Sequence, residues 1–236
     1  MPLDLTGISN RNEYFSSHYL AALIEGDLKD TLARWKETAE ANPDSEAHRS
    51  PERRIATLYK PYFNLLNRYV VLRDPAERLA AQREFLPRLL DALGYVYQPS
   101  WRSIGPSGTP LAKCLRLPML GEVTKSSGAP WLWIVEALPP ADEPETDPLS
   151  LPVHSAQFDG DPAHHDPQLA SPHPARDLAW DELVTRHIFS LDEAPRWIFL
   201  LSLGHVVLLD RTKWPEKRHL SFDCERRYGK PMKWAT

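Results

Sequence analysis

Two apolar runs constrain the fold of this chain more than any other feature. The first, Trp131–Ala137, is short and β-prone and carries Glu136 near its end. The second, Trp197–Arg211, has the pattern of two buried strands joined at a turn that contains Gly204. The runs therefore predict a strand that delivers an acid from a buried sheet and, later in the chain, a buried hairpin.

The residues before these runs have the apolar period of helices. A first helix is expected to end at Gly26–Asp27, where a second helix begins. An amphipathic helix is expected over residues 55–69. Another opens at Asp74–Pro75 and ends at a Gly94 cap. The N-terminal part is therefore predicted to be helical.

The period changes from helix to strand after this last helix. Strands over residues 114–123 and 131–138 are expected to form a hairpin around Ser126–Gly128. The segment Pro139–Arg176 holds nine prolines. We expect this segment to be a mobile loop with no packed core of its own.

These elements together predict an α+β protein. Residues 1–94 form a helical N-terminal subdomain, and residues 95–236 form a module built on a small mixed sheet. Within the module, residues 139–176 are the long acidic, proline-rich flexible loop. A helix over residues 180–189 is expected to precede the second apolar run.

Charge is distributed unevenly along the chain. The formal net charge is −4, but Pro139–Ala175 alone contributes −7, because it has seven acids and no Lys or Arg. The rest of the chain therefore carries +3. Arg211–Lys233 holds eight Lys or Arg against three acids. Such an end is either a solvated basic face or a DNA-contacting one. The candidate DNA-binding residues are Arg211, Lys213, Lys217, Arg218, Arg226 and Arg227.

Two carboxylates are candidates for a metal site. Glu136 and Glu122 lie on the two strands of the predicted hairpin, and together they can offer hard oxygen ligands to Mg²⁺. Restriction-type nuclease cores (PD-(D/E)xK) add a lysine two residues after the second acid, and here that position is Leu138. Lys125 can take the lysine's role only in a displaced geometry. We therefore expect a degenerate nuclease-like fold, with a catalytic Glu122–Glu136–Lys125 site as the alternative.

Other features limit the class of protein. Cys114 and Cys224 are far apart, which indicates no disulfide framework and fits a reducing cytoplasm. The N-terminus lacks a signal-peptide pattern, and the longest apolar run is too short to span a bilayer. Glycine-rich nucleotide-binding motifs are missing, so we expect no cofactor in this chain, apart from Mg²⁺ if it is a nuclease. A cytoplasmic protein without membrane contact is expected.

Four passages resemble the N-terminal region of large bacterial DNA methyltransferases, namely Leu5–Leu20, Pro130–Ala137, Trp197–Asp210 and Asp210–Asp223. They are similar to Eco57I-like, type IIG-like proteins of restriction-modification and phage-defence systems, including the methyltransferase of the DISARM system. The resemblance covers nearly the whole chain. It implies a helical lead-in and a nuclease-like module ahead of an adenine-specific methyltransferase domain. That domain would bind S-adenosylmethionine, and its motifs are absent from this chain.

Three functional hypotheses follow. In the first, the chain is an accessory domain of an adenine-specific DNA methyltransferase that engages DNA or assists assembly and has no catalysis of its own. Its partners would be DNA and the methyltransferase domain or other defence-system subunits. In the second, it is a Mg²⁺-dependent DNA endonuclease domain. In the third, its N-terminal helices dock on the methyltransferase, and in isolation the chain self-associates through an exposed apolar patch.

Overall fold

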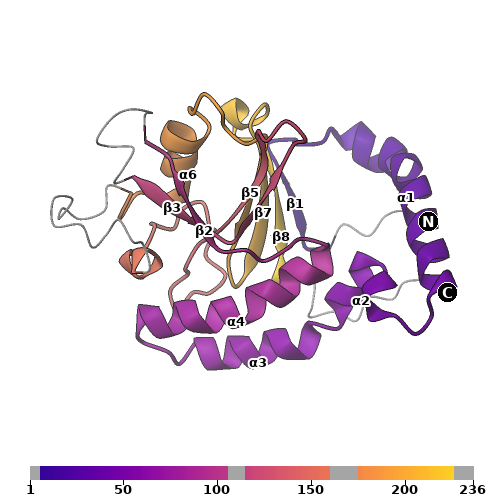
Figure 1. The fold of residues 1–236 in the computed structure, drawn as a ribbon, viewed down its shortest axis with the longest axis horizontal. Coiled ribbons are helices and arrows are strands. Elements are labelled where there is room, and N and C mark those ends of the chain that lie inside the picture. Colours follow the sequence, from indigo (N-terminus) through magenta and orange to yellow (C-terminus); the bar gives the residue numbers. More distant parts are fainter. Residues whose placement is uncertain (1–5, 106–114, 160–174, 226–236) are drawn as a thin grey trace.

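The computed structural model describes residues 6–105, 115–159 and 175–225. A six-stranded mixed sheet forms its centre, with the strand order β1-β8-β7-β6-β5-β4 (Figure 1). Strands β5 and β6 run parallel, and the other neighbouring strands are antiparallel. The six strands are β1 Ile8–Arg11, β4 Gly121–Thr124, β5 Pro130–Glu136, β6 Trp197–Leu201, β7 His205–Asp210 and β8 His219–Asp223.

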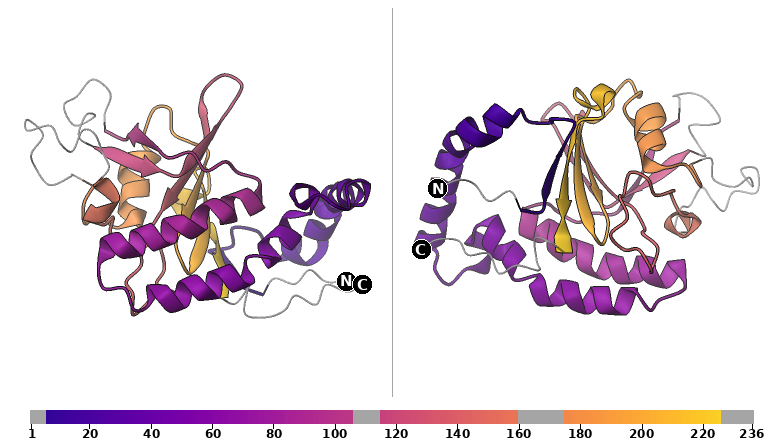
Figure 2. Two further views of the ribbon diagram at one scale, coloured as in Figure 1. Left: turned by 60° about the horizontal axis from the view of Figure 1, so that its bottom comes forward. Right: turned by 180° about the vertical axis from the view of Figure 1, so that it is seen from behind.

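Other elements cover both faces of this sheet (Figures 1 and 2). One face packs against helices of the N-terminal half, which we call the helical layer: α2 Pro51–Ala56, α3 Tyr59–Tyr69 and α4 Pro75–Leu93. The opposite face packs against α6 Trp180–Leu183, the π-helical turn η6 Val184–Ile188 and the antiparallel pair β2 Ser100–Ser103 and β3 Arg116–Met119. The expected α+β fold, with N-terminal helices ahead of a mixed sheet, is confirmed.

Strand β5 contributes to the apolar core on both faces of the sheet. Trp133 and Val135 belong to the core on the α6 side, whereas Leu132 and Ile134 belong to the core on the α4 side. This alternation follows from the two-residue period of a strand. Glu136 has the same parity as Leu132 and Ile134, so its side chain is directed toward α4.

Several local predictions are confirmed. The side chain of Asp74 caps α4 by accepting a hydrogen bond from the backbone N–H of Ala76 at 2.9 Å, and the helix ends at Gly94 with a φ of 86°. Strands β4 and β5 form the expected hairpin, whose turn contains Gly128 at a φ of 84°. The strand predicted over residues 114–123 is, however, divided between β4 and β3, and β3 pairs with β2 in a separate sheet. Gly204 lies in the turn between β6 and β7, which pair as predicted. Local turn and cap chemistry therefore predicted these features correctly.

The N-terminal part differs from its predicted purely helical structure. Residues Ile8–Arg11 form β1, which pairs with β8 near the other end of the described chain. Gly26 does not break a helix: α1 Ile24–Ala41 runs through it and continues the π-helical turn η1 Tyr19–Leu23. A glycine inside a helix costs only about 1 kcal/mol relative to alanine, so its neighbours can outweigh it. The helix expected over residues 55–69 is divided between α2 and α3.

The proline-rich segment also differs from its prediction. Its first part, residues 139–159, contributes buried side chains to the core on the α6 side: Leu149, Leu151, Val153 and Phe158. Apolar residues lie between the prolines in this part. The prediction missed them because it rested on the average composition of the whole segment. The expectation of no packed core is wrong for this part, and residues 160–174 lie outside the described residues.

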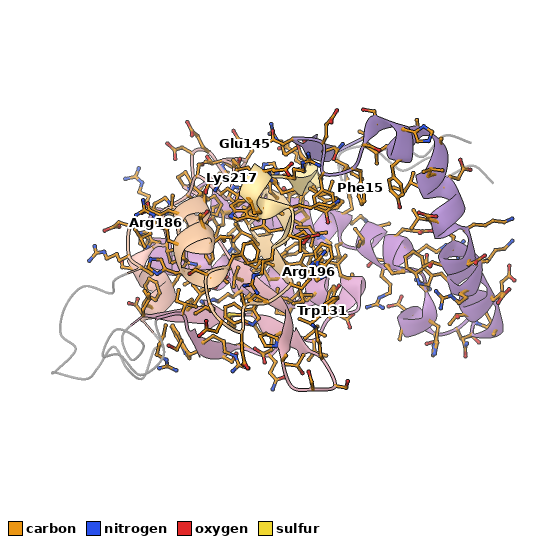
Figure 3. The ribbon with its side chains drawn as sticks, turned by 90° about the horizontal axis from the view of Figure 1, so that it is seen from above. Phe15, Trp131, Glu145, Arg186, Arg196 and Lys217 are labelled. Atoms are coloured by element: carbon orange, nitrogen blue, oxygen red, sulfur yellow. The ribbon has the colours of Figure 1, made fainter. Side chains whose placement is uncertain are left out.

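Helix α1 stands away from the sheet and the helical layer (Figures 2 and 3). None of its residues is buried, and it packs mainly against η1 and the short 3-10 helix η2 Glu46–His48. Large apolar side chains are exposed along it, with Leu32 at 40% and Trp35 at 36%, and Leu23 at the end of η1 is 47% exposed. Among the described residues, no helix combines the length and apolar character that crossing a bilayer requires.

Gly204 provides a test of the packing of the proline-rich segment. A Cβ at this position would lie 2.6 Å from the carbonyl oxygen of Pro144 and 3.0 Å from the Cα of Glu145. We expect Gly204→Ala to lower the free energy of unfolding by about 1–3 kcal/mol, because backbone atoms must move. Denaturant unfolding measures this change.

Gly26→Ala is the matched control, because nothing lies within 4 Å of a Cβ at Gly26. Alanine is also the better helix former, so this variant should lose no stability. Equal stability of the two variants would contradict the packing of residues 139–159 against the β6–β7 turn.

Candidate functional site

The end of β5 holds a buried acid. Glu136 is only 1% exposed and lies beside β6, the one parallel neighbour in the sheet. Two consecutive residues of α4 approach its carboxylate. Arg83 donates from Nε to Oε1 at 2.7 Å and forms an ion pair with the same oxygen at 2.5 Å. Gln82 donates to Oε2 at 3.4 Å and to the carbonyl of Ala137 at 3.1 Å.

The backbone around Glu136 is tied to further elements. Gln157, in the 3-10 helix η3 Ser155–Phe158, donates to the carbonyl oxygen of Glu136 at 2.8 Å. The Tyr69 hydroxyl at the end of α3 donates to the carbonyl of Pro139 at 2.7 Å. These hydrogen bonds join α3, α4 and η3 to the end of β5. We call this set of contacts, which links the end of β5 to α3, α4 and η3, the Glu136 joint.

Burial has a clear electrostatic consequence for this acid. Loss of solvation raises the pKa of the Glu136 carboxyl above its ordinary value, and the opposing effects of Arg83 and Gln82 offset this only in part. A carboxylate in an apolar environment requires a partner of opposite charge, and Arg83 supplies it.

Glu122 lies on the other side of the sheet. It stands opposite Trp133 in the β4–β5 register, so it belongs to the face of Trp133 and Val135, not to the face of Glu136. Arg102 of β2 binds it through both Nε, at 2.7 Å from Oε2, and a terminal guanidinium nitrogen. The structure does not bring the two predicted metal ligands together.

Lys125, which takes the lysine's role in the alternative nuclease hypothesis, is also engaged elsewhere. The ammonium of Lys125 lies 4.9 Å from the centre of the Trp131 ring, in the β4–β5 turn. Leu138, at the position where nuclease cores carry a lysine, is buried in the core on the α4 side. Within residues 6–105, 115–159 and 175–225, no group of three or more His, Cys, Asp or Glu side chains is arranged to hold a metal ion.

The predicted DNA-binding residues of the basic end mostly contact the protein itself. Lys213 donates to the carbonyl of Tyr14 at 2.7 Å and lies 4.0 Å from the centre of that ring. Lys217 lies beside the 3-10 turn η7 Trp214–Glu216 (Figure 3). It forms an ion pair with Asp181, and its ammonium lies 4.2 Å from the centre of the Trp214 ring.

The remaining members of that set follow the same pattern where they are described. Arg218 pairs with Glu216 at 2.5 Å, and Arg211 approaches the carbonyl of Leu191 at 3.5 Å. Arg226 and Arg227 lie outside the described residues. Among the described cations of this end, Lys213 holds the N-terminal segment and Lys217 holds η7 in place.

The helical layer carries cations that sequence reasoning missed. Residues Pro51–Leu93 include eight Lys or Arg and five acids. Arg54, Arg68 and Arg83 pair with acids, and Arg78 donates to the backbone carbonyls of Leu72 and Arg73. The other four pair with no acid among the described residues. These four are Arg53, Lys60, Arg73 and Arg88. The sequence did contain a signal for these cations, namely a surplus of positive charge on the predicted helices. The larger positive charge of the C-terminal end drew attention away from it.

Comparison with known proteins adds no identification. No protein-family model, no curated protein and no solved structure matches this chain.

The Glu136–Arg83 pair predicts a pH-dependent stability effect. The raised pKa means that the folded state binds this proton more tightly than the unfolded state does, so the free energy of unfolding falls as pH rises through the raised value. In Arg83→Met the pKa rises further. The free energy of unfolding of the variant should fall by about 2–3 kcal/mol at neutral pH, a moderate loss because Arg83 is 35% exposed and the pair is only partly buried. The loss should be smaller in acid, where Glu136 is protonated.

Denaturant unfolding at several pH values measures this effect. The double variant Arg83→Met/Glu136→Gln is the control, and it should recover part of the loss at neutral pH, since no buried charge is left unpaired. An Arg83→Met effect that is the same at all pH values would contradict the role assigned to this pair.

Proposed function

We propose that this chain is a DNA-engaging accessory module, without catalysis of its own, of a bacterial adenine-specific DNA methyltransferase of the restriction-modification type. Its sheet would be a degenerate form of the restriction-nuclease fold. The sequence resemblance supports the association with a methyltransferase and a phage-defence system. S-adenosylmethionine would be bound by the methyltransferase partner, because the sequence carries no glycine-rich nucleotide-binding motif.

The observation that carries the DNA-engaging role is the outward positive charge of the helical layer. Arg53, Lys60, Arg73 and Arg88 have no acidic partner recorded among the described residues, in contrast to the engaged cations of the C-terminal end. Solvated cations of this kind can replace the counterions of DNA phosphates. Phosphate contact is therefore proposed for the helices, not for the basic end.

The two carboxylates favour the non-catalytic role over a Mg²⁺-dependent endonuclease. A nuclease needs both acids and a lysine at one metal site. Here Arg83 binds Glu136 on one face of the sheet, and Arg102 binds Glu122 on the other. These residues do not fit a shared Mg²⁺ ion.

A binding titration with duplex DNA at several salt concentrations tests the proposed function. The affinity should fall steeply as salt rises, with a log–log slope of roughly −0.9 for each phosphate contacted. Incubation with Mg²⁺ should leave the DNA intact. Absence of binding at low salt, or an affinity independent of salt, would contradict DNA engagement, and Mg²⁺-dependent cleavage would contradict the lack of catalysis.

Helix α1 favours a second function, assembly with a protein partner. Most of the stability of a helix in a protein comes from packing of its apolar face. In α1 that face, which includes Leu32 and Trp35, is exposed. A protein partner that covers this face would stabilise the helix.

The assembly function predicts self-association of the isolated chain through α1. Sedimentation velocity should show concentration-dependent association that is lost in Leu32→Glu/Trp35→Glu, because charges replace the apolar contact. Lys36→Ala, on the same helix with an exposed side chain, is the control and should associate like the original chain. A chain that remains monomeric at all concentrations would count against this function.

A further inference from the structure

The outer face of the helical layer contains a groove between α3 and α4. Its volume is about 540 Å³, and its floor includes the buried side chains of Leu65 and Phe85. The polar residues along its rim are Lys60, Asn64 and Arg68 of α3 and Glu84 and Arg88 of α4. On each helix these rim residues are four apart, so each set lies along one side of its helix.

The two ends of the groove differ in charge. Helices α3 and α4 run antiparallel, side by side (Figure 1). At one end, Arg68 pairs with Glu84 at 2.6 Å. Because the helices are antiparallel, the residue one turn earlier in α3, Asn64, faces the residue one turn later in α4, Arg88. Lys60 is a further turn toward this second end.

The second end carries two cations and an amide. Among the described residues, neither Lys60 nor Arg88 has a recorded acidic partner. An ammonium, a guanidinium and an amide together supply N–H donors that match the acceptor-only oxygens of a phosphate group. Lys60 also lies in the first turn of α3, where the helix dipole favours an anion.

We propose that this α3–α4 groove is where the chain binds the phosphodiester backbone of duplex DNA, with Lys60, Asn64 and Arg88 as the contacting residues. The proposal rests on the proposed DNA-engaging function and assigns its site. Lys60 and Asn64 are separated by roughly 6 Å along α3. This separation exceeds the roughly 3.4 Å of duplex axis per phosphate of one strand, so the groove matches a continuous backbone better than a single phosphate.

Glu84 limits binding at the first end of the groove. Its carboxylate neutralises Arg68 and would repel a phosphate that entered from the second end. Removal of this charge frees the Arg68 guanidinium for the DNA backbone. The groove therefore predicts opposite effects for changes at its two ends.

The experiment measures the affinity for duplex DNA as a function of salt for three variants of the full chain. Lys60→Ala/Arg88→Ala should bind roughly tenfold more weakly or worse at low salt, and its log–log slope should be shallower by roughly 0.9 for each lost contact. Glu84→Gln should bind more tightly than the original chain. All altered side chains lie on the surface, and thermal unfolding verifies that the variants are folded.

Lys36→Ala/Arg186→Ala is the matched control. Like the groove variant, it removes two positive charges, here Lys36 of α1 and Arg186 of η6, each of which belongs to an exposed ion pair. It therefore changes the net charge equally without touching the groove. Its affinity should remain close to that of the original chain. If the groove variant and this control weaken binding equally, the groove assignment is overturned while the DNA-engaging function stands. If the original chain does not bind DNA, the proposed function itself fails.

Competition by inorganic phosphate distinguishes a backbone site from a site for free phosphate. At equal ionic strength, sodium phosphate and sodium chloride should weaken DNA binding to the same extent. A specific loss of DNA binding in phosphate would overturn the assignment of the groove to a nucleic-acid backbone.

Discussion

Glu136 places a charged group at the end of an otherwise apolar strand, and the pairing of that charge with Arg83 joins the sheet to the helical layer. Desolvation of a carboxylate in a protein interior costs several kcal/mol unless a partner compensates it. Arg83 and Gln82 of α4 provide that compensation, and Gln157 of η3 fixes the backbone of the same residue. The position of α4 over β5 and β6 follows from this joint as well as from the apolar core beneath the helix.

The same interaction bears on function. The Glu136 carboxylate pairs with Arg83 of the helical layer, so it is not available to bind a metal ion together with Glu122. Glu122 itself pairs with Arg102 on the opposite face of the sheet. The acid that suggested a nuclease therefore serves to hold the helices in place. Those helices in turn present Lys60 and Arg88 to solvent. Stability and the proposed DNA contact thus depend on one structural unit, with the joint on its inner side and the groove on its outer side.

Sequence patterns predicted the features that depend on neighbouring residues. The Asp74–Pro75 start and Gly94 end of α4 follow from cap chemistry, and both hairpins follow from apolar runs around a glycine turn. The pairing of β1 with β8 was not predictable in this way, because it joins residues about two hundred positions apart. The contacts of Lys213 with Tyr14 and of Lys217 with Asp181 are equally non-local, and a charge run gives no sign of them. For the candidate site, the sequence identified Glu136 as the important acid but not Arg83 as its partner.

The pKa of the Glu136 carboxyl tests the central claim most directly. NMR of its side-chain carbon measures this pKa with and without Mg²⁺. A carboxyl buried against Arg83 should titrate above the ordinary range of glutamate, and Mg²⁺ should not change its pKa. Metal binding requires the ionised form, so a metal ligand would show a pKa that falls when Mg²⁺ is added. An unchanged, raised pKa is the result that this account predicts. A fall in the pKa with Mg²⁺ would contradict it and return Glu136 to the role of a metal ligand.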